Sequence, residues 1–237
     1  MSRVTIIETG IVSPKNRERH GSYPQMFERM IGAADASVAF DTVSIAAGEP
    51  LPDIGGLQAI LITGSSAGVY DDFGWIAPLE AFVRAANQRK VPMVGVCFGH
   101  QLIAQALGGT ARKSDKGWGL GRHVYDVAAG NGLIEGTRIA LACAHQDQVV
   151  TPPAGATTIL SSDFTPHAGL LYAGGTTFSV QAHPEFTLGF ALACCEMVRS
   201  KREAPDDIVT SAEASLAKPL ESARLGGAIT RFLTRSA

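Results

Sequence analysis

The chain has 237 residues, of which 46% are hydrophobic and 18% are charged. This composition is typical of a globular protein with enough apolar material for a core. The net charge of −2 gives no support for binding to nucleic acid or to an anionic membrane surface. No apolar run reaches the roughly 18 residues that a membrane-spanning helix needs.

Apolar runs alternate with helical patterns in the first half of the chain. We expect strands at residues 4–7, 37–43, 56–63 and 92–96, and helices at residues 23–34, 75–88 and 98–107. Strands that are apolar along their length and are separated by helices indicate a parallel sheet with helices on both faces.

The region from residue 109 to residue 180 is rich in glycine and in short β-type runs, and a helical tail follows it. We expect strands at residues 122–127, 138–144, 157–160, 169–172 and 177–181, and helices at residues 188–202, 206–216 and 221–233. The short runs predict antiparallel strands joined to the main sheet. The predicted fold is therefore an α/β three-layer sandwich, with a mostly parallel central sheet flanked by helices and a smaller antiparallel β portion. We expect a single domain over residues 1–237.

The four cysteines are Cys97, Cys143, Cys194 and Cys195, and no two of them have the C-x-x-C spacing of a structural zinc site. The first residues are charged too early for a signal peptide and predict a strand. We therefore expect a cytoplasmic protein with reduced thiols. No phosphate-binding glycine motif lies between a strand and a helix, so no metal and no other cofactor is predicted.

A buried strand leads directly into G-V-C-F-G at residues 95–99, and a helix follows at once. This G-x-C-x-G pattern is the cysteine form of the nucleophile elbow of hydrolases. The sharp turn would put the Cys97 sulfur at a helix N-terminus, where the helix dipole and free N–H groups favour a thiolate. The Phe98 N–H is placed to bind an oxyanion, and Gln101 can face the same pocket one helical turn on. The alternative is a buried structural cysteine on a tight turn.

His183 ends an apolar run and is followed by Pro184 and Glu185. Pro184 favours an extended backbone at His183, and side chains two residues apart in extended chain project to the same side. Glu185 is therefore well placed to hold the imidazole. A nucleophile, a base and an acid that orients the base form a catalytic triad, here Cys97, His183 and Glu185.

G-x-C-x-G-x-Q followed by H-P-E resembles the signature of class I glutamine amidotransferases, and the resemblance covers nearly the whole chain. The sequence from residue 62 to residue 70 stands where this family has its oxyanion loop. Residues 144–149 resemble the histidine–x–aspartate loop of the branch related to the amidotransferase domain of GMP synthase. Residues 21–27 and 70–72 resemble free-standing members of that branch, which include plant γ-glutamyl peptidases.

The resemblance implies that Cys97 is the nucleophile, that His183 is the general base and then the acid, and that Glu185 orients the imidazole. It also implies a set of substrate-binding residues. These are Gly64 and Ser65 in the oxyanion loop, Phe98, whose N–H would join that of Ser65 in the oxyanion hole, Gln101, His145 and Asp147.

The family chemistry implies thiolate attack on the side-chain amide of glutamine, release of ammonia and hydrolysis of a γ-glutamyl thioester to glutamate. Because few residues follow Glu185, we expect the ammonia to pass to a synthetase partner on another chain. A γ-glutamyl peptidase acting on larger γ-glutamyl amides is the alternative, and a non-catalytic interaction module is a third hypothesis, which the intact triad residues disfavour.

Two departures from the family pattern leave the identity of the substrate open. The oxyanion loop usually contains Gly-Gly-Pro, whereas this chain has Gly64-Ser65-Ser66. A backbone N–H binds the oxyanion, so a serine is chemically acceptable if it can adopt the required backbone conformation. Ala182 stands before the histidine where the family often has Phe, which enlarges the predicted pocket wall.

Overall fold

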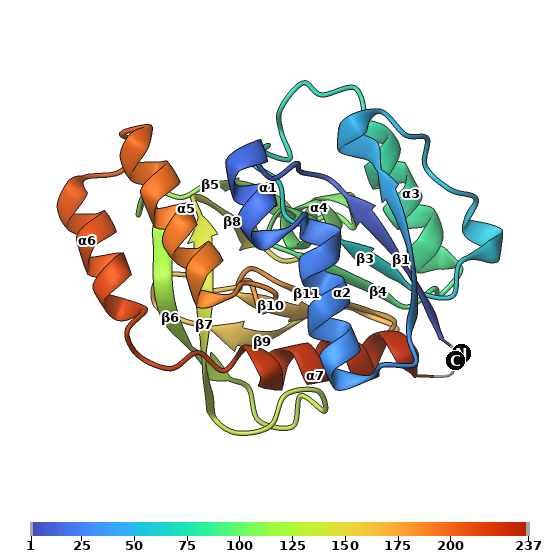
Figure 1. Ribbon diagram of the computed structural model, residues 1–237. Coiled ribbons are helices and arrows are strands. Elements are labelled where there is room, and N and C mark those ends of the chain that lie inside the picture. The colour runs from blue at the N-terminus through green and yellow to red at the C-terminus, as the bar shows by residue number, and fades with distance from the viewer. Residues whose placement is uncertain (1, 236–237) are drawn as a thin grey trace.

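The computed structural model describes residues 2–235, which contain one nine-stranded sheet and one two-stranded sheet (Figure 1). The first five strands across the large sheet are parallel to their neighbours, and the remaining four pair antiparallel. Their order is β2 (Ala39–Ser44), β1 (Arg3–Glu8), β3 (Ile60–Ile62), β4 (Met93–Val96), β11 (Thr177–Val180), β10 (Gly169–Leu171), β9 (Thr157–Ser161), β6 (Gly119–Val127) and β7 (Arg138–His145). The small antiparallel sheet consists of β5 (Thr110–Lys113) and β8 (Asp147–Thr151).

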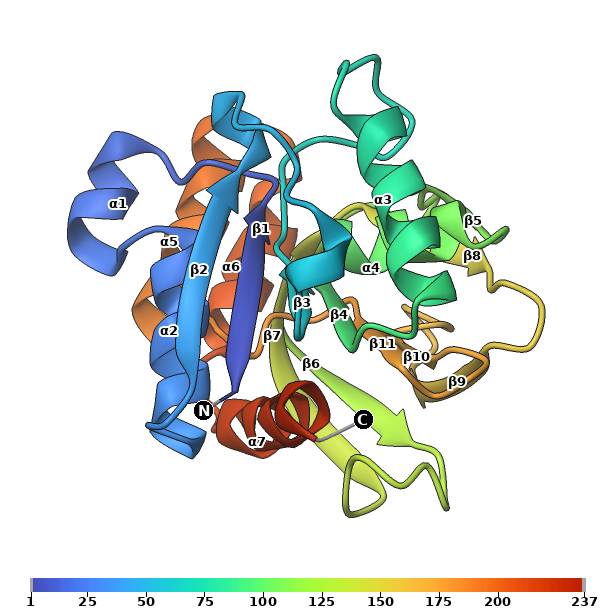
Figure 2. The same cartoon turned by 90° about the vertical axis from the view of Figure 1, so that its right-hand side faces the viewer.

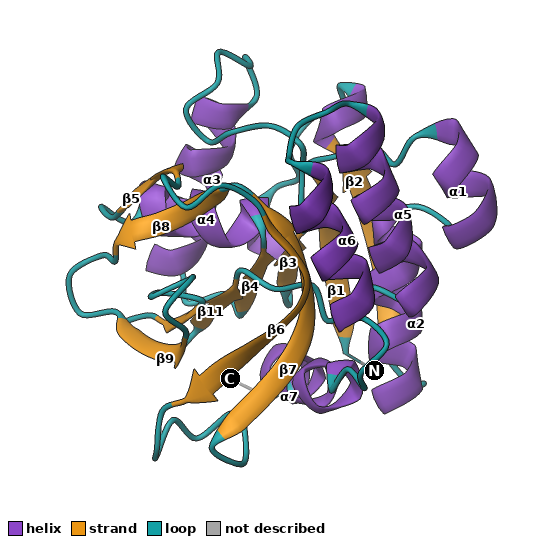
Figure 3. Ribbon diagram, turned by 90° about the vertical axis from the view of Figure 1, so that its left-hand side faces the viewer, coloured by secondary structure: helices purple, strands orange, loops and turns teal. Residues whose placement is uncertain are grey.

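Helices cover both faces of the parallel strands and complete three layers (Figure 2). One face carries α2 (Tyr23–Ala34) and α7 (Ser222–Thr234), and the other carries α3 (Ile76–Gln88) and α4 (Phe98–Ala106). Beyond them, α5 (Leu188–Ser200) and α6 (Asp206–Ser215) pack on β6 and β7, and α1 (Pro14–His20) packs against α5 (Figure 3). The predicted α/β three-layer fold is confirmed.

Strand β1 shows why the inner parallel strands carry apolar residues on both faces. Val4 and Ile6 are fully buried in the core under α2 and α7, whereas Ile7 is fully buried in the core under α3 and α4. Successive side chains in a strand point to opposite faces, so a strand between two layers of helices must be apolar on both. No helix within residues 2–235 combines the length and the hydrophobicity that crossing a lipid bilayer requires.

Some elements differ from the sequence prediction. The helix α1 and the strands β5 and β8 were not predicted, and β3 is shorter than the predicted strand over residues 56–63. The short 3₁₀ helices η1 (Ile45–Ala47) and η2 (Ile54–Gly56) were also not predicted. The predicted loop around His145 and Asp147 is the corner between β7 and β8, because β8 turns away from the main sheet to pair with β5.

Two glycines allow the turn between β4 and α4 to pack against its neighbours. A Cβ atom on Gly95 would overlap with the carbonyl oxygen of Gly99, and one on Gly99 would overlap with the carbonyl oxygen of Ile62 in β3. Because both obstacles are backbone atoms, they cannot move aside as a flexible side chain would. The helix α4 therefore begins close to β3 only with glycine at these positions.

We predict that Gly99→Ala lowers the free energy of unfolding by about 1–3 kcal/mol, which is the usual effect of overpacking a rigid site. Gly32→Ala is the matched control, because Gly32 lies within α2 and a Cβ atom there meets nothing within 4 Å. A helical Gly→Ala change should raise the free energy of unfolding by roughly 0.5–1 kcal/mol. Urea unfolding of both variants measures the difference, and equal stability of the two would contradict the packing argument.

Candidate active site

Cys97 lies between the end of β4 and the first residue of α4, in a strained backbone conformation. Its φ is +54°, a left-handed value that a residue with a Cβ rarely adopts. Hydrogen bonds fix this geometry, because the Cys97 N–H donates to the Val180 oxygen at 2.9 Å and the Gln101 N–H donates to the Cys97 oxygen at 3.1 Å. The residue is 5% exposed and lies in the wall of a cleft. The sulfur is thus held at the carboxyl edge of the sheet.

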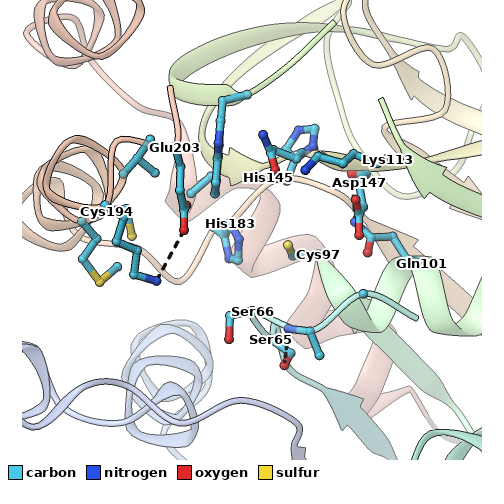
Figure 4. Close-up of a pocket in the computed structure, with 18 of the residues that line it drawn as sticks. Ser65, Ser66, Cys97, Gln101, Lys113, His145, Asp147, His183, Cys194 and Glu203 are labelled. Atoms are coloured by element: carbon cyan, nitrogen blue, oxygen red, sulfur yellow. Dashed lines mark hydrogen bonds and ion pairs between the residues drawn. The ribbon is translucent and has the colours of Figure 1, made fainter. Parts of the chain in front are cut away.

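His183 and Glu185 follow β11, the strand that pairs with β4 in parallel. Carboxyl ends of neighbouring parallel strands meet at the same sheet edge, which brings this segment to Cys97. Figure 4 shows the His183 ring beside Cys97. The Nδ1 atom of His183 lies 2.7 Å from Oε1 of Glu185, and both side chains are almost fully buried. The imidazole also stacks on the Phe186 ring with a centroid distance of 3.9 Å. The structure therefore brings the three predicted triad residues together.

The surroundings of His183 favour its protonated form. Burial lowers the pKa of His183, but the negative charges of Glu185 and Cys97, with hydrogen bonds to both, outweigh burial and raise this pKa well above its ordinary value. Because Nδ1 is engaged by Glu185, Nε2 is the nitrogen left for Cys97. Because the pKa of His183 is higher in the folded chain than in the unfolded chain, the protonated ring stabilises the fold. This stabilisation is complete at pH values below the unfolded pKa of about 6.5, and it is lost as the pH rises through the folded pKa.

The loop after β3 lies directly against the sulfur and the imidazole. A Cβ atom on Gly64 would lie 3.1 Å from Cε1 of His183 and 3.5 Å from Cβ of Cys97. Thr9 supports this loop from below, because its hydroxyl donates to the Thr63 carbonyl at 2.9 Å. Within residues 2–235, neither the Ser65 N–H nor the Phe98 N–H donates to a protein acceptor. The two N–H groups without a protein acceptor thus belong to Phe98, which follows Cys97, and to Ser65, which follows Gly64.

Serine fits the oxyanion loop without backbone strain. In the described part of the chain, the non-glycine residues with a positive φ are Lys90, Cys97 and Arg202, so Ser65 is not among them. The Ser65 hydroxyl accepts a hydrogen bond from the Ala67 N–H at 3.1 Å and stabilises the next turn of the loop. Ser65 therefore occupies this loop without the positive φ that would favour glycine.

The sulfur and the imidazole open into a cleft of about 480 Å³ that extends to both sides of them. The side toward β5 and β8 is lined by Ser65, Tyr70, Asp71, Gln101, Lys113, His145 and Asp147. The side toward α5 is lined by Tyr23, Phe186, Cys194, Met197, Lys201 and Glu203. Figure 4 shows Gln101 and Asp147 on one side of Cys97, and Cys194 and Glu203 on the other.

The predicted binding residue Gln101 lines the cleft, but its amide group also has protein partners. Its Nε2 donates to the backbone carbonyl oxygen of Asp147 at 2.9 Å and to Oε1 of Gln181 at 3.1 Å. The side-chain NH₂ group thus ties α4 to β8 and β11. The carbonyl oxygen of the Gln101 side chain is the polar atom left for a ligand.

His145 and Asp147, which the resemblance implies as substrate-binding residues, both line the cleft and differ in their protonation. Burial lowers the pKa of His145 to about 3, so its ring is neutral. The Nδ1 atom of the ring donates to the backbone carbonyl oxygen of Asp147 at 3.1 Å. The Asp147 carboxylate accepts a hydrogen bond from the Tyr70 hydroxyl, which is 3.0 Å from each of its oxygens. Tyr70 thereby connects the oxyanion loop to β8 across the mouth of the cleft.

The sequence analysis did not single out several residues that line the cleft. Lys201 and Glu203 follow α5, and no sequence pattern links them to Cys97. Tyr23, in α2, lies within residues 21–27, which resemble free-standing members of the predicted branch. Another histidine near the nucleophile, His100, faces the core, where its ring nitrogens contact the Ser179 hydroxyl at 2.7 Å and the His167 carbonyl at 3.0 Å. Among residues 2–235, no group of three His, Cys, Asp or Glu side chains is arranged to hold a metal ion.

Named relatives include both kinds of protein in the predicted branch. A glutamine amidotransferase-like protein of Schizosaccharomyces pombe is 27% identical over 184 residues, which cover 76% of this chain and 74% of the relative. Gamma-glutamyl peptidase 3 of Arabidopsis thaliana is 28% identical over 142 residues, which cover 56% of this chain and 57% of that protein. One subunit of the glutamine-hydrolysing GMP synthase of Sulfolobus acidocaldarius is 26% identical over 150 residues, which cover 62% of this chain and 78% of that protein.

Solved structures with the same fold and a family model complete the comparison. A glutamine amidotransferase from Thermotoga maritima aligns with a TM-score of 0.74 and 18% identity over 99% of each chain. At that identity the likeness shows the fold alone. The model of the family described as glutamine amidotransferase class-I matches residues 18–191, which is most of the chain. This chain belongs to the class I glutamine amidotransferase family.

Proposed function

We propose that this protein is a cysteine-dependent glutaminase that hydrolyses the side-chain amide of glutamine, releasing ammonia and glutamate. One observation carries the proposal: a sulfur, an imidazole and a carboxylate are buried together beside two free backbone N–H groups. This arrangement has the parts that amide hydrolysis through a thioester requires, namely a nucleophile, a proton carrier, an orienting acid and an oxyanion site.

In the proposed reaction, the Cys97 thiolate attacks the γ-carbonyl carbon of glutamine. The N–H groups of Phe98 and Ser65, with Gly64 beside the sulfur, stabilise the negative charge on the carbonyl oxygen. His183, protonated because its pKa is raised, gives its proton to the departing nitrogen, so that ammonia and a γ-glutamyl thioester form. The neutral imidazole then takes a proton from water, which hydrolyses the thioester to glutamate and restores the thiolate. Glu185 holds Nδ1 throughout.

The side of the cleft toward β5 and β8 suits the glutamyl group. The Asp147 carboxylate carries negative charge for an α-ammonium group, and Lys113, which pairs with Asp147 in the β5–β8 register, carries positive charge for an α-carboxylate. The Gln101 carbonyl can accept a further hydrogen bond, and His145 positions the Asp147 backbone. Recognition of an amino-acid head group by these opposite charges is part of the proposal.

The relatives support the chemistry and the expectation of a partner. The Sulfolobus relative is by name one part of a glutamine-hydrolysing GMP synthase, so we propose that ammonia from this chain likewise serves a synthetase on another chain. The single domain over residues 1–237, the cytoplasmic location and the absence of a cofactor stay predictions. The intact arrangement of Cys97, His183 and Glu185 supports catalysis over a purely structural role.

A second function, hydrolysis of larger γ-glutamyl amides, is favoured by the extent of the cleft. The cleft continues past His183 toward α5, where Cys194, Met197 and Lys201 line it. Its volume of about 480 Å³ falls within the range of roughly 300–1,000 Å³ that is usual for ligands larger than a single amino acid. Gamma-glutamyl peptidase 3 is one relative that carries this activity in its name.

We predict that Cys97→Ala lowers glutamate release from glutamine by at least about a thousandfold, since loss of a nucleophile removes the whole covalent pathway. Cys195→Ala is the control, because Cys195 is buried in α5 and does not line the cleft. Labelling by a glutamine-mimicking chloroketone tests the same thiol without requiring turnover. A Cys97→Ala variant that still turns over substrate would exclude the mechanism. Turnover of γ-glutamyl peptides without any turnover of glutamine would favour the second function.

We predict that Glu185→Gln lowers the pKa of His183, because the substitution removes a negative charge while the ring stays buried. The titration of the ring, followed by NMR of histidine-labelled protein, measures this change. His123 is an internal control, since burial is the main reason for its lowered pKa and its titration should not move. An unchanged titration of His183 in the variant would refute the role given to Glu185.

A further inference from the structure

The part of the cleft toward α5 has polar groups that the hydrolysis of glutamine does not use. We call this set the α5 subsite and define it by Tyr23, Cys194, Met197, Lys201 and Glu203. Tyr23 is the first residue of α2, and a capping box fixes the start of that helix. Its ring packs edge-on against Phe190 with a centroid distance of 6.0 Å. The subsite therefore rests on two anchored helices.

Tyr23 brings a hydrogen-bond donor to this subsite. Burial, together with the nearby Cys194, Cys97 and Glu185, raises the pKa of the Tyr23 phenol, so the hydroxyl keeps its proton. Tyr23 lines the cleft and is partly exposed to it. A protonated phenol that borders a cleft can donate a hydrogen bond to the carbonyl group of a ligand.

Lys201 brings a positive charge to the subsite, and its contact with Glu203 is long for a hydrogen bond. Its Nζ lies 3.7 Å from Oε1 of Glu203, longer than the roughly 2.7–3.2 Å of a good hydrogen bond, and the two side chains are 62% and 39% exposed. Arg199, on the same helix, is engaged instead, because it forms two 2.7 Å contacts with Glu213 of α6. The ammonium group of Lys201 can therefore turn toward an anion in the cleft.

The geometry of the reaction directs the amine half of an amide substrate into the α5 subsite. His183 has to protonate the departing nitrogen, and it lies on the α5 side of Cys97 (Figure 4). The glutamyl group lies on the opposite side, near Gln101 and Asp147. Whatever is attached to the amide nitrogen must therefore extend past His183 toward Cys194, Met197 and Lys201.

We propose that the α5 subsite binds the peptide half of a γ-glutamyl peptide, with Lys201 binding its terminal carboxylate and Tyr23 donating to a peptide carbonyl. This inference rests on the proposed cysteine chemistry and specifies the substrate class of the second function, the hydrolysis of larger γ-glutamyl amides. Water cleaves the γ-glutamyl amide bond, so that glutamate forms and the peptide leaves with a free amino group. Cys194 and Met197 provide apolar contact for the intervening side chain, and Glu203 competes with the substrate for Lys201.

Binding to the full-length Cys97→Ala protein tests the subsite without depending on turnover. Calorimetry would compare γ-glutamyl-Ala-Gly with the same peptide carrying a C-terminal carboxamide. A partly exposed ion pair of up to about 1 kcal/mol corresponds to about fivefold tighter binding of the free acid. Lys201→Met should remove this preference, and Glu203→Gln should increase it. Lys218→Met, which replaces an exposed lysine that does not line the cleft, should preserve it.

Equal affinity for acid and carboxamide, or a preference that survives Lys201→Met, would overturn the inference. Tighter binding of a γ-glutamyl amide that ends in an ammonium group would also overturn it, since Glu203 would then select the ligand. These results are independent of the proposed function, which is judged on the wild-type protein by glutamate release and by chloroketone labelling of Cys97. A protein that labels and hydrolyses glutamine but binds both peptides equally keeps the function and loses the subsite.

Discussion

The strained backbone at Cys97 is the constraint on which the rest of the site depends. A left-handed φ at a residue with a Cβ costs about 1–3 kcal/mol, and it persists only where the surrounding structure enforces it. Three neighbouring strands do so. The Cys97 N–H donates to Val180 at the end of β11, the Gly99 N–H donates to Thr63 after β3, and β4 itself leads into the turn. Hydrogen bonds to the ends of the parallel strands thus hold the Cys97 sulfur in one position.

The same sheet edge explains why the partners of Cys97 meet it there. β3, β4 and β11 are adjacent and parallel, so the oxyanion loop, the elbow and the His183 segment all begin at their carboxyl ends. His183 is tied further to β7, because its N–H donates to the Ala142 oxygen at 2.9 Å. Both the parallel and the antiparallel part of the sheet therefore hold the imidazole.

The sequence predicted the parts of the site that depend on local pattern and on parallel topology. Cys97 was identifiable because glycines at positions 95 and 99 permit the backbone contacts that its turn makes. Glu185 was expected beside His183 because extended chain places side chains two residues apart on the same side, and the two side chains are in contact. Its catalytic role stays a prediction. The fold class followed from the strands that are apolar on both faces.

Contacts between segments distant in the chain could not be predicted in the same way. The hydrogen bond between Tyr70 and Asp147 joins a loop to a short strand 77 positions later, and no local pattern indicates it. The strands β5 and β8 were missed because only four and five residues form them, and their pairing depends on packing against α4 rather than on an apolar alternation. Contacts that depend on such long-range packing can be identified only from the three-dimensional structure.

The centre and the ends of the cleft differ in burial, so we expect the groups that react and the groups that select the substrate to lie in different parts of it. The proposed reaction uses groups at the centre of the cleft, where Cys97, His183 and Glu185 are buried and backbone hydrogen bonds fix Cys97 and His183. The ends carry charged side chains that are more exposed, such as Lys201, and these can change without disturbing the turn at Cys97. A buried polar centre tolerates little variation, because an unsatisfied group there is costly, whereas exposed charges contribute little to folding. The reaction that we propose can therefore serve glutamine or larger γ-glutamyl amides, according to what the α5 side of the cleft accepts.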